Sequence, residues 1–161
     1  MNLLWQQSAS SLAKLIASKQ VSSSDVVEAH LARIAEVNPK VNAIVRVLAD
    51  EARAAAAIAD QVVASGAPLG LLHGVPCTVK ENIDVAGLPT TWGVPALAGA
   101  VVQLDAPVVQ RMRAAGAFPI GRTNLPDMAL RVSTDSSLHG ITRNPWNAPS
   151  ARQAVRAAAR P

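Results

Sequence analysis

One lysine, Lys80, stands at the end of a short apolar run and is the residue of this chain best suited to proton transfer. Residues 74–79 predict a buried strand, which places Lys80 at the strand's end. Burial disfavours the ammonium form, and a neutral amine can take a proton from a hydroxyl nucleophile. The alternative is structural, an ion pair with Glu81 or Asp84, and on the residues alone it is favoured because most lysines are solvated.

The other reactive side chains point to ordinary structural roles. Cys77 is the only cysteine and lies in the same apolar run, so we expect a buried, unreactive thiol in a reducing cytoplasm. His30 has no second ligand at helical spacing, and no acid is evident as a partner for His73 or His139. We therefore predict no metal site and no cofactor.

The first third of the chain reads as helical. Ser22 can cap a helix start, with Asp25 three residues on near the positive helix end, and this helix is expected to stop at Asn38-Pro39. An alanine-rich helix is expected over about residues 47–64, closing at Gly66. Two apolar stripes support these helices: Leu12, Leu15 and Ile16, then Val27, Leu31 and Ile34.

From residue 67 onward the pattern changes to short apolar runs separated by proline and glycine. Residues 105–116 read as a capped helix, with Asp105 at its start, Pro107 in the first turn and Gly116 after its end. A strand, this helix and a second strand over residues 117–121 describe a parallel crossover. The predicted fold class is α/β.

Charge and hydropathy exclude two classes of protein. The formal net charge is +4, but Arg152, Arg156 and Arg160 lie in the last fourteen residues; without them twelve basic residues face eleven acidic ones. Residues 1–147 lack the basic clusters with interleaved aromatic residues that are typical of nucleic-acid binding. No stretch is long and apolar enough for a membrane span, and the N-terminus does not resemble a secretory signal.

Residues 72–91 resemble the lysine motif of the amidase-signature family, GVP-x-x-VK-[DE]-N-x-D-x-x-G-x-x-T. Three further blocks follow in the family's order, over residues 105–117, 121–127 and 139–147. Four separated blocks in the correct order make this a specific resemblance. It implies N-terminal helices packed on an incomplete, mixed, mainly parallel sheet. Residues 1–66 form the helical part and residues 67–147 the α/β part that carries the lysine.

The resemblance also implies amide hydrolysis by a Ser–cis-Ser–Lys triad, with Lys80 as the catalytic base. The expected substrate is a small-molecule carboxylic amide, with no cofactor, metal, nucleic acid or membrane involved. A free amidase and the amidotransferase subunit that supplies ammonia both fit, as does a homo-oligomer of the full-length parent.

The tail departs from the family. After residue 147 the family shows a TPGGSSGG-type loop, whereas residues 148–161 contain no glycine and only Ser150 as a serine. Codons for residues 151–161 read two bases later permit Thr-Pro-Gly-Gly-Ser-Ser-Gly-Gly-Ala-Ala. We therefore interpret the tail as frameshifted and the chain as truncated before both serines, inactive alone. The alternatives are a non-catalytic binding or assembly module, or the N-terminal half of a split amidase.

Overall fold

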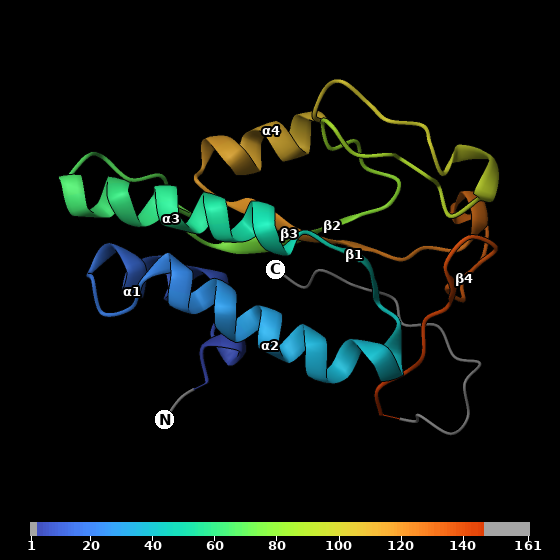
Figure 1. Cartoon of the computed structure of the whole chain (residues 1–161), viewed down its shortest axis with the longest axis horizontal. Helices are drawn as coiled ribbons and strands as arrows, with labels where there is room; N and C mark the ends of the chain where they lie inside the picture. The colour runs from blue at the N-terminus through green and yellow to red at the C-terminus, as the bar shows by residue number, and fades with distance from the viewer. Residues whose placement is uncertain (1–2, 147–161) are drawn as a thin grey trace. The chain divides into compact units, whose positions relative to one another are not determined.

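A computed structural model describes residues 3–146 of the chain (Figure 1). Helices and short strands alternate in the α/β manner that the sequence predicts. The helices are α1 (Ala9–Ala17), α2 (Ser23–Val41), α3 (Ala49–Ser65) and α4 (Pro107–Ala114), and short 3-10 turns cover Leu4–Gln6, Pro95–Leu97 and Asp127–Ala129. The strands are β1 (Ile44–Val47), β2 (Pro76–Lys80), β3 (Phe118–Thr123), β4 (Asp135–Ser136) and β5 (Gly140–Ile141).

The chain forms two compact units that interleave along the sequence. Unit 1 takes the described residues of Met1–Glu36, Val47–Thr78 and Pro107–Gly121, and unit 2 those of Val37–Arg46, Val79–Ala106 and Arg122–Pro161. The apolar stripes predicted from the sequence supply the core of unit 1. One cluster contains Val27, Leu31, Ala52, Ala56, Phe118 and Ile120, and another contains Leu12, Ile16, Val26 and Val75.

The start of α2 confirms the cap predicted at Ser22 and shows that Asp25 makes it reciprocal. The backbone N–H of Ser22 donates to the Asp25 carboxylate at 3.0 Å, and the backbone N–H of Asp25 donates to the Ser22 hydroxyl at 2.9 Å. Asp60, on α3, also accepts from the backbone N–H groups of Ser23 and Ser24, at 2.6 and 3.1 Å. A carboxylate at the positive end of a helix is favourable, so this contact links α3 to the start of α2.

The end of α2 corrects the sequence expectation, because the helix continues through Pro39 to Val41. A proline costs most in a helix interior, and here it occupies the last turn. Asn38 closes the chain reversal that follows, since its side-chain oxygen accepts from the backbone N–H groups of Ala43 and Ile44, both at 2.9 Å. The helix therefore ends at Val41 and not at the proline, and the Asn38 side chain bonds the chain that reverses after it. The end of α3 agrees with expectation, with Gly66 in the left-handed region at φ 73°.

The three-stranded sheet has the order β1-β3-β2. The backbone N–H of Phe118 donates to the carbonyl of Val75, and the backbone N–H of Glu81 donates to the carbonyl of Thr123. The residue numbers of the bonded positions rise in the same direction on both sides, so β2 and β3 are parallel. Because α4 connects β2 to β3, the predicted parallel crossover is confirmed. β1 has only four residues and was not predicted from the sequence. The backbone N–H groups of Leu48 and Asn124 donate to the carbonyls of Ile120 and Ala43, so β1 runs antiparallel to β3.

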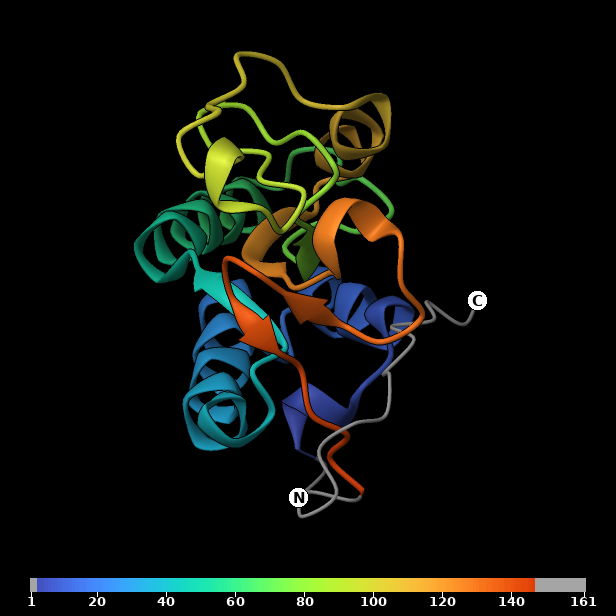
Figure 2. The same cartoon turned by 90° about the vertical axis from the view of Figure 1, so that its right-hand side faces the viewer.

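Within unit 2, β4 and β5 form an antiparallel hairpin, seen as the orange and red arrows in Figure 2. Two asparagines tie this hairpin to the rest of the unit. The Asn42 side-chain amide donates to the carbonyl of His139 at 2.7 Å, and that of Asn124 donates to the carbonyl of Gly140 at 3.0 Å. Thr142 joins both, because its hydroxyl donates to the Asn42 carbonyl and accepts from Asn124. Across residues 3–146 no helix has the length and hydropathy of a membrane span.

Candidate active site

Lys80 is the last residue of β2, as the sequence predicts, and its side chain is half-buried. Its carbonyl accepts a hydrogen bond from the backbone N–H of Ile83 at 3.0 Å, which turns the chain immediately after the strand. Within the described part of the chain, no ion pair connects Lys80 to Glu81 or Asp84, the two partners that the structural interpretation requires. The amine is therefore not occupied by either carboxylate.

Glu81 is buried and bound elsewhere. Its Oε1 accepts from Arg122 Nε at 3.2 Å, and its Oε2 accepts a short hydrogen bond from the hydroxyl of Thr91. The same hydroxyl accepts from the backbone N–H of Gly93 at 3.1 Å. A buried carboxylate needs this degree of compensation, because desolvation of an unpaired charge is expensive.

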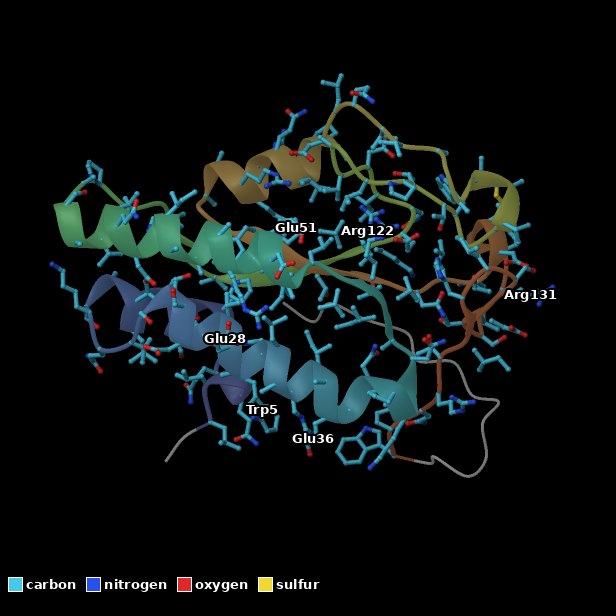
Figure 3. The ribbon with its side chains drawn as sticks, viewed as in Figure 1. Trp5, Glu28, Glu36, Glu51, Arg122 and Arg131 are labelled. Atoms are coloured by element: carbon cyan, nitrogen blue, oxygen red, sulfur yellow. The ribbon has the colours of Figure 1, made fainter. Side chains whose placement is uncertain are left out.

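Arg122 lies in β3 and has no exposed surface (labelled in Figure 3). Burial lowers the pKa of its guanidinium, and the nearby Glu81 carboxylate opposes that shift. Its environment also includes the charges of Asp84 and Arg46. Arg122 is thus the buried counter-ion of the Glu81 carboxylate.

Several buried polar atoms around the end of β2 have no hydrogen-bond partner among residues 3–146. Buried polar groups are almost always bonded in folded proteins, so each one is costly. Two of the residues that carry them, Arg122 and His139, face Glu81, the residue after Lys80. These atoms are Asn82 Oδ1, Thr90 Oγ1, Arg122 Nη1 and Nη2, and His139 Nε2.

The turn after Thr91 is fixed closely against the hairpin. Gly93 has φ 75°, and a Cβ on it would lie 3.0 Å from the carbonyl oxygen of Leu125. Its carbonyl accepts from the Ser136 hydroxyl at 2.7 Å and from the backbone N–H of Leu138 at 3.1 Å. Only glycine combines this conformation with this approach. The turn thereby holds the Thr91 hydroxyl at Glu81.

Cys77 is half-buried, where the sequence predicts a buried thiol. Its Sγ donates to the carbonyl of Phe118 at 3.3 Å, and burial raises the pKa of the thiol to about 11. A thiol in this state is a poor nucleophile at neutral pH. Cys77 is therefore a packing residue.

The structure corrects the interpretation of His139. Its Nε2 lies 3.4 Å from Glu81 Oε2, so an acid does face it, 58 residues away in sequence. His73 Nε2 instead lies 3.0 Å from the carbonyl of Ala59, and His30 Nδ1 lies 2.7 Å from that of Val26. In the described ranges, no group of three or more His, Cys, Asp or Glu side chains is arranged to hold a metal ion.

The sequence points to Lys80 as a candidate but gives little sign of the polar cluster around Glu81. The signal for Arg122 was present, since a charged residue inside the otherwise apolar strand of residues 118–123 needs a buried partner. Nothing local indicated that this partner is Glu81 or that Thr91 completes the arrangement.

Comparison with known proteins gives the chain its family. The family model Amidase matches residues 25–151. The chain is similar to indoleacetamide hydrolase of Bradyrhizobium diazoefficiens, with 49% identity over 89% of this chain and 28% of that protein. It is also similar to a glutamyl-tRNA(Gln) amidotransferase subunit of Acidothermus cellulolyticus, with 44% identity over 91% of this chain and 29% of that protein.

A solved structure gives the same result for the fold. A bacterial aryl acylamidase of the amidase-signature family superimposes with a TM-score of 0.82 and 34% identity, over 88% of this chain and 30% of that enzyme. The chain thus spans less than a third of the length of these relatives. The ordered motifs, the parallel crossover that carries Lys80 and these similarities together show that the chain belongs to the amidase-signature family of hydrolases.

Proposed function

We propose that this chain provides the catalytic base of an amide hydrolase, and that Lys80 is that base. The observation that supports it is the state of the lysine: half-buried, at the end of β2, and without either carboxylate as a partner. The adjacent carboxylate, Glu81, is neutralised by Arg122 and does not compete for the amine. A lysine held in this way can exchange a proton with a hydroxyl group.

In the proposed reaction, Lys80 takes a proton through a bridging serine from a nucleophilic serine. The serine oxygen attacks the carbonyl carbon of a carboxylic amide, and backbone N–H groups stabilise the oxyanion. The C–N bond breaks, and the proton held by the lysine passes to the nitrogen, so that ammonia or an amine leaves. Water then attacks the acyl ester, yields the acid and returns the proton to the serine.

Both serines must come from a segment with a glycine–serine loop, which residues 1–161 do not contain. We therefore expect the 161-residue polypeptide alone to release no ammonia from amides. Triad members act as a unit, so the base without its hydroxyl partners retains almost none of the activity.

The test is a chimera in which residues 1–146 replace the corresponding part of indoleacetamide hydrolase, with indole-3-acetamide as the first substrate. Lys80→Met should lower kcat by about a thousandfold or more, because it removes the base and preserves the side-chain volume. The matched control is Lys40→Met, since Lys40 is an exposed lysine at the end of α2. Ammonia release that survives Lys80→Met would refute the assignment.

A second candidate function is assembly with a complementary polypeptide, and exposed apolar side chains in unit 2 favour it. Leu130, Val132 and Trp146 are 84%, 89% and 94% exposed. Large apolar groups so exposed favour an interface. Mixing the 161-residue chain with a separately produced C-terminal remainder of the relative would test this: a complex that Leu130→Ser and Val132→Ser weaken supports assembly, and no complex by sedimentation excludes it.

A further inference from the structure

The carboxylate of Glu81 makes more contacts than the neutralisation of Arg122 requires. It accepts from Arg122 Nε and from the Thr91 hydroxyl, and its Oε2 also lies 3.4 Å from His139 Nε2. These partners come from β3, from the connection between β2 and α4, and from the segment before β5. Glu81 is therefore the point at which three parts of unit 2 meet.

The backbone of the same residue is fixed at both of its polar groups. Its N–H donates to the carbonyl of Thr123 at 3.0 Å, and its carbonyl accepts from the N–H of Trp92 at 3.4 Å. The preceding carbonyl, that of Lys80, is bonded to Ile83. Residues 80 and 81 are thus held by side-chain and main-chain contacts together.

A role in stability alone does not account for this arrangement. A buried ion pair contributes little net stability compared with apolar residues of similar volume. Here the pair also leaves Arg122 Nη1 and Nη2 buried without partners in the described part of the chain, which adds further cost. A costly, fully enclosed arrangement directly beside a candidate base is typical of residues that position a reacting group.

We propose that Glu81 is a positioning residue for Lys80: clamped by Thr91 and Arg122, it fixes the backbone at the end of β2 and so holds the lysine side chain in one orientation. Among the described residues no ion pair joins Glu81 to the Lys80 amine, so Glu81 acts on Lys80 through the main chain and not by contact with the amine. Its purpose rests on the proposed function of Lys80, but the ordering itself can be measured without any amide substrate.

The experiment measures the mobility of Lys80 in the full 161-residue chain. Lysine labelled with 13C at Cε gives signals from Lys14, Lys19, Lys40 and Lys80 only, and Lys80→Arg assigns the last. The expected Cε order parameter of Lys80 is about twice that of Lys40. Thr91→Val, which removes the hydroxyl and keeps the shape, should reduce it to the Lys40 level, and Glu81→Gln should do the same.

Two controls separate positioning from general destabilisation. Thr91→Ser restores the hydroxyl and should restore the order, whereas a mere loss of packing would not be rescued by a smaller side chain. Glu28→Gln breaks a surface pair with Arg53 in unit 1 and should leave Lys80 unchanged. In the chimera, Thr91→Val should lower kcat ten- to a hundredfold with KM unchanged, as expected for a misplaced catalytic group.

The outcomes are distinct from those that test the catalytic role. If Lys80 is as mobile as Lys40 in the wild-type chain, or stays ordered in a folded Thr91→Val or Glu81→Gln variant, the positioning role is wrong. If the chimera keeps its activity with Lys80→Met, the catalytic role is wrong even though Glu81 still orders the strand end. Loss of order in the variants together with rescue by Thr91→Ser supports the proposal.

Discussion

Replacing Arg122 with methionine should destabilise unit 2 strongly. Arg122 has no exposed surface, and its Nε donates to Glu81, which is 2% exposed. Methionine fills much of the same volume, but it leaves the Glu81 carboxylate buried without its counter-ion. The cost therefore comes from electrostatics and not from a cavity.

The magnitude follows from the geometry of the pair. Breaking a buried ion pair by removing one partner costs about 3–5 kcal/mol. The Thr91 hydroxyl still donates to Glu81 and offsets about 1 kcal/mol of this. With a urea dependence of about 2 kcal/mol per molar, a net loss near 3 kcal/mol moves the unfolding midpoint down by roughly 1.5 M. Arg122→Met combined with Glu81→Gln should recover much of the loss, with a coupling energy of about 2–3 kcal/mol.

The assay is urea unfolding followed by the fluorescence of Trp92, which is half-buried next to Thr91. Trp5→Phe and Trp146→Phe remove the other two indoles and leave a signal from unit 2. A midpoint shift below roughly 0.5 M for Arg122→Met would refute the reasoning. So would a double variant whose loss equals the sum of the two single losses, because the pair would then contribute no interaction.

Three further predictions concern local contacts in the folded chain, and a fourth concerns the gene. Because the pKa of Cys77 is raised to about 11, its alkylation by iodoacetamide at pH 8 should be about a hundredfold slower than in the urea-unfolded chain, and its rate should keep rising with pH past 9. Asp60→Ala should cost about 1–3 kcal/mol in urea unfolding, because it leaves donors at the start of α2 unbonded, while Asp50→Ala, at a 99% exposed side chain, should cost almost nothing. Hydrogen bonds from Ser22 lower the pKa of Asp25 from its ordinary 3.8. The Asp25 carboxylate therefore contributes its full stabilisation above pH 3.8, and this contribution is lost as the pH falls through the lowered pKa. Asp25→Asn should remove this pH dependence and flatten the acid limb of a stability–pH profile. In the gene, codons for residues 151–161 should spell a glycine–serine loop when read two bases later, and codons that do not would exclude the frameshift.

Much of the architecture was predictable because its causes are local. The Ser22–Asp25 cap, the glycine at the end of α3 and the apolar stripes of the helices each depend on residues a few positions apart. The parallel crossover was also predictable, since the helix of residues 107–114 lies between two short apolar runs. The end of α2 was predicted wrongly because Pro39 does not stop the helix, which continues to Val41 before the Asn38 side chain bonds the reversing chain.

By itself, the sequence determined the family, the α/β class and Lys80 as the candidate base, because ordered motifs and periodic apolar residues are visible along the chain. Only the tertiary structure decided what surrounds that lysine. From the sequence, Glu81 could have paired with Lys80. In the folded chain it instead pairs with Arg122, 41 residues away, and also lies close to Thr91 and His139. Partner choice between buried charges depends on which strands lie side by side, and that is a property of the folded chain.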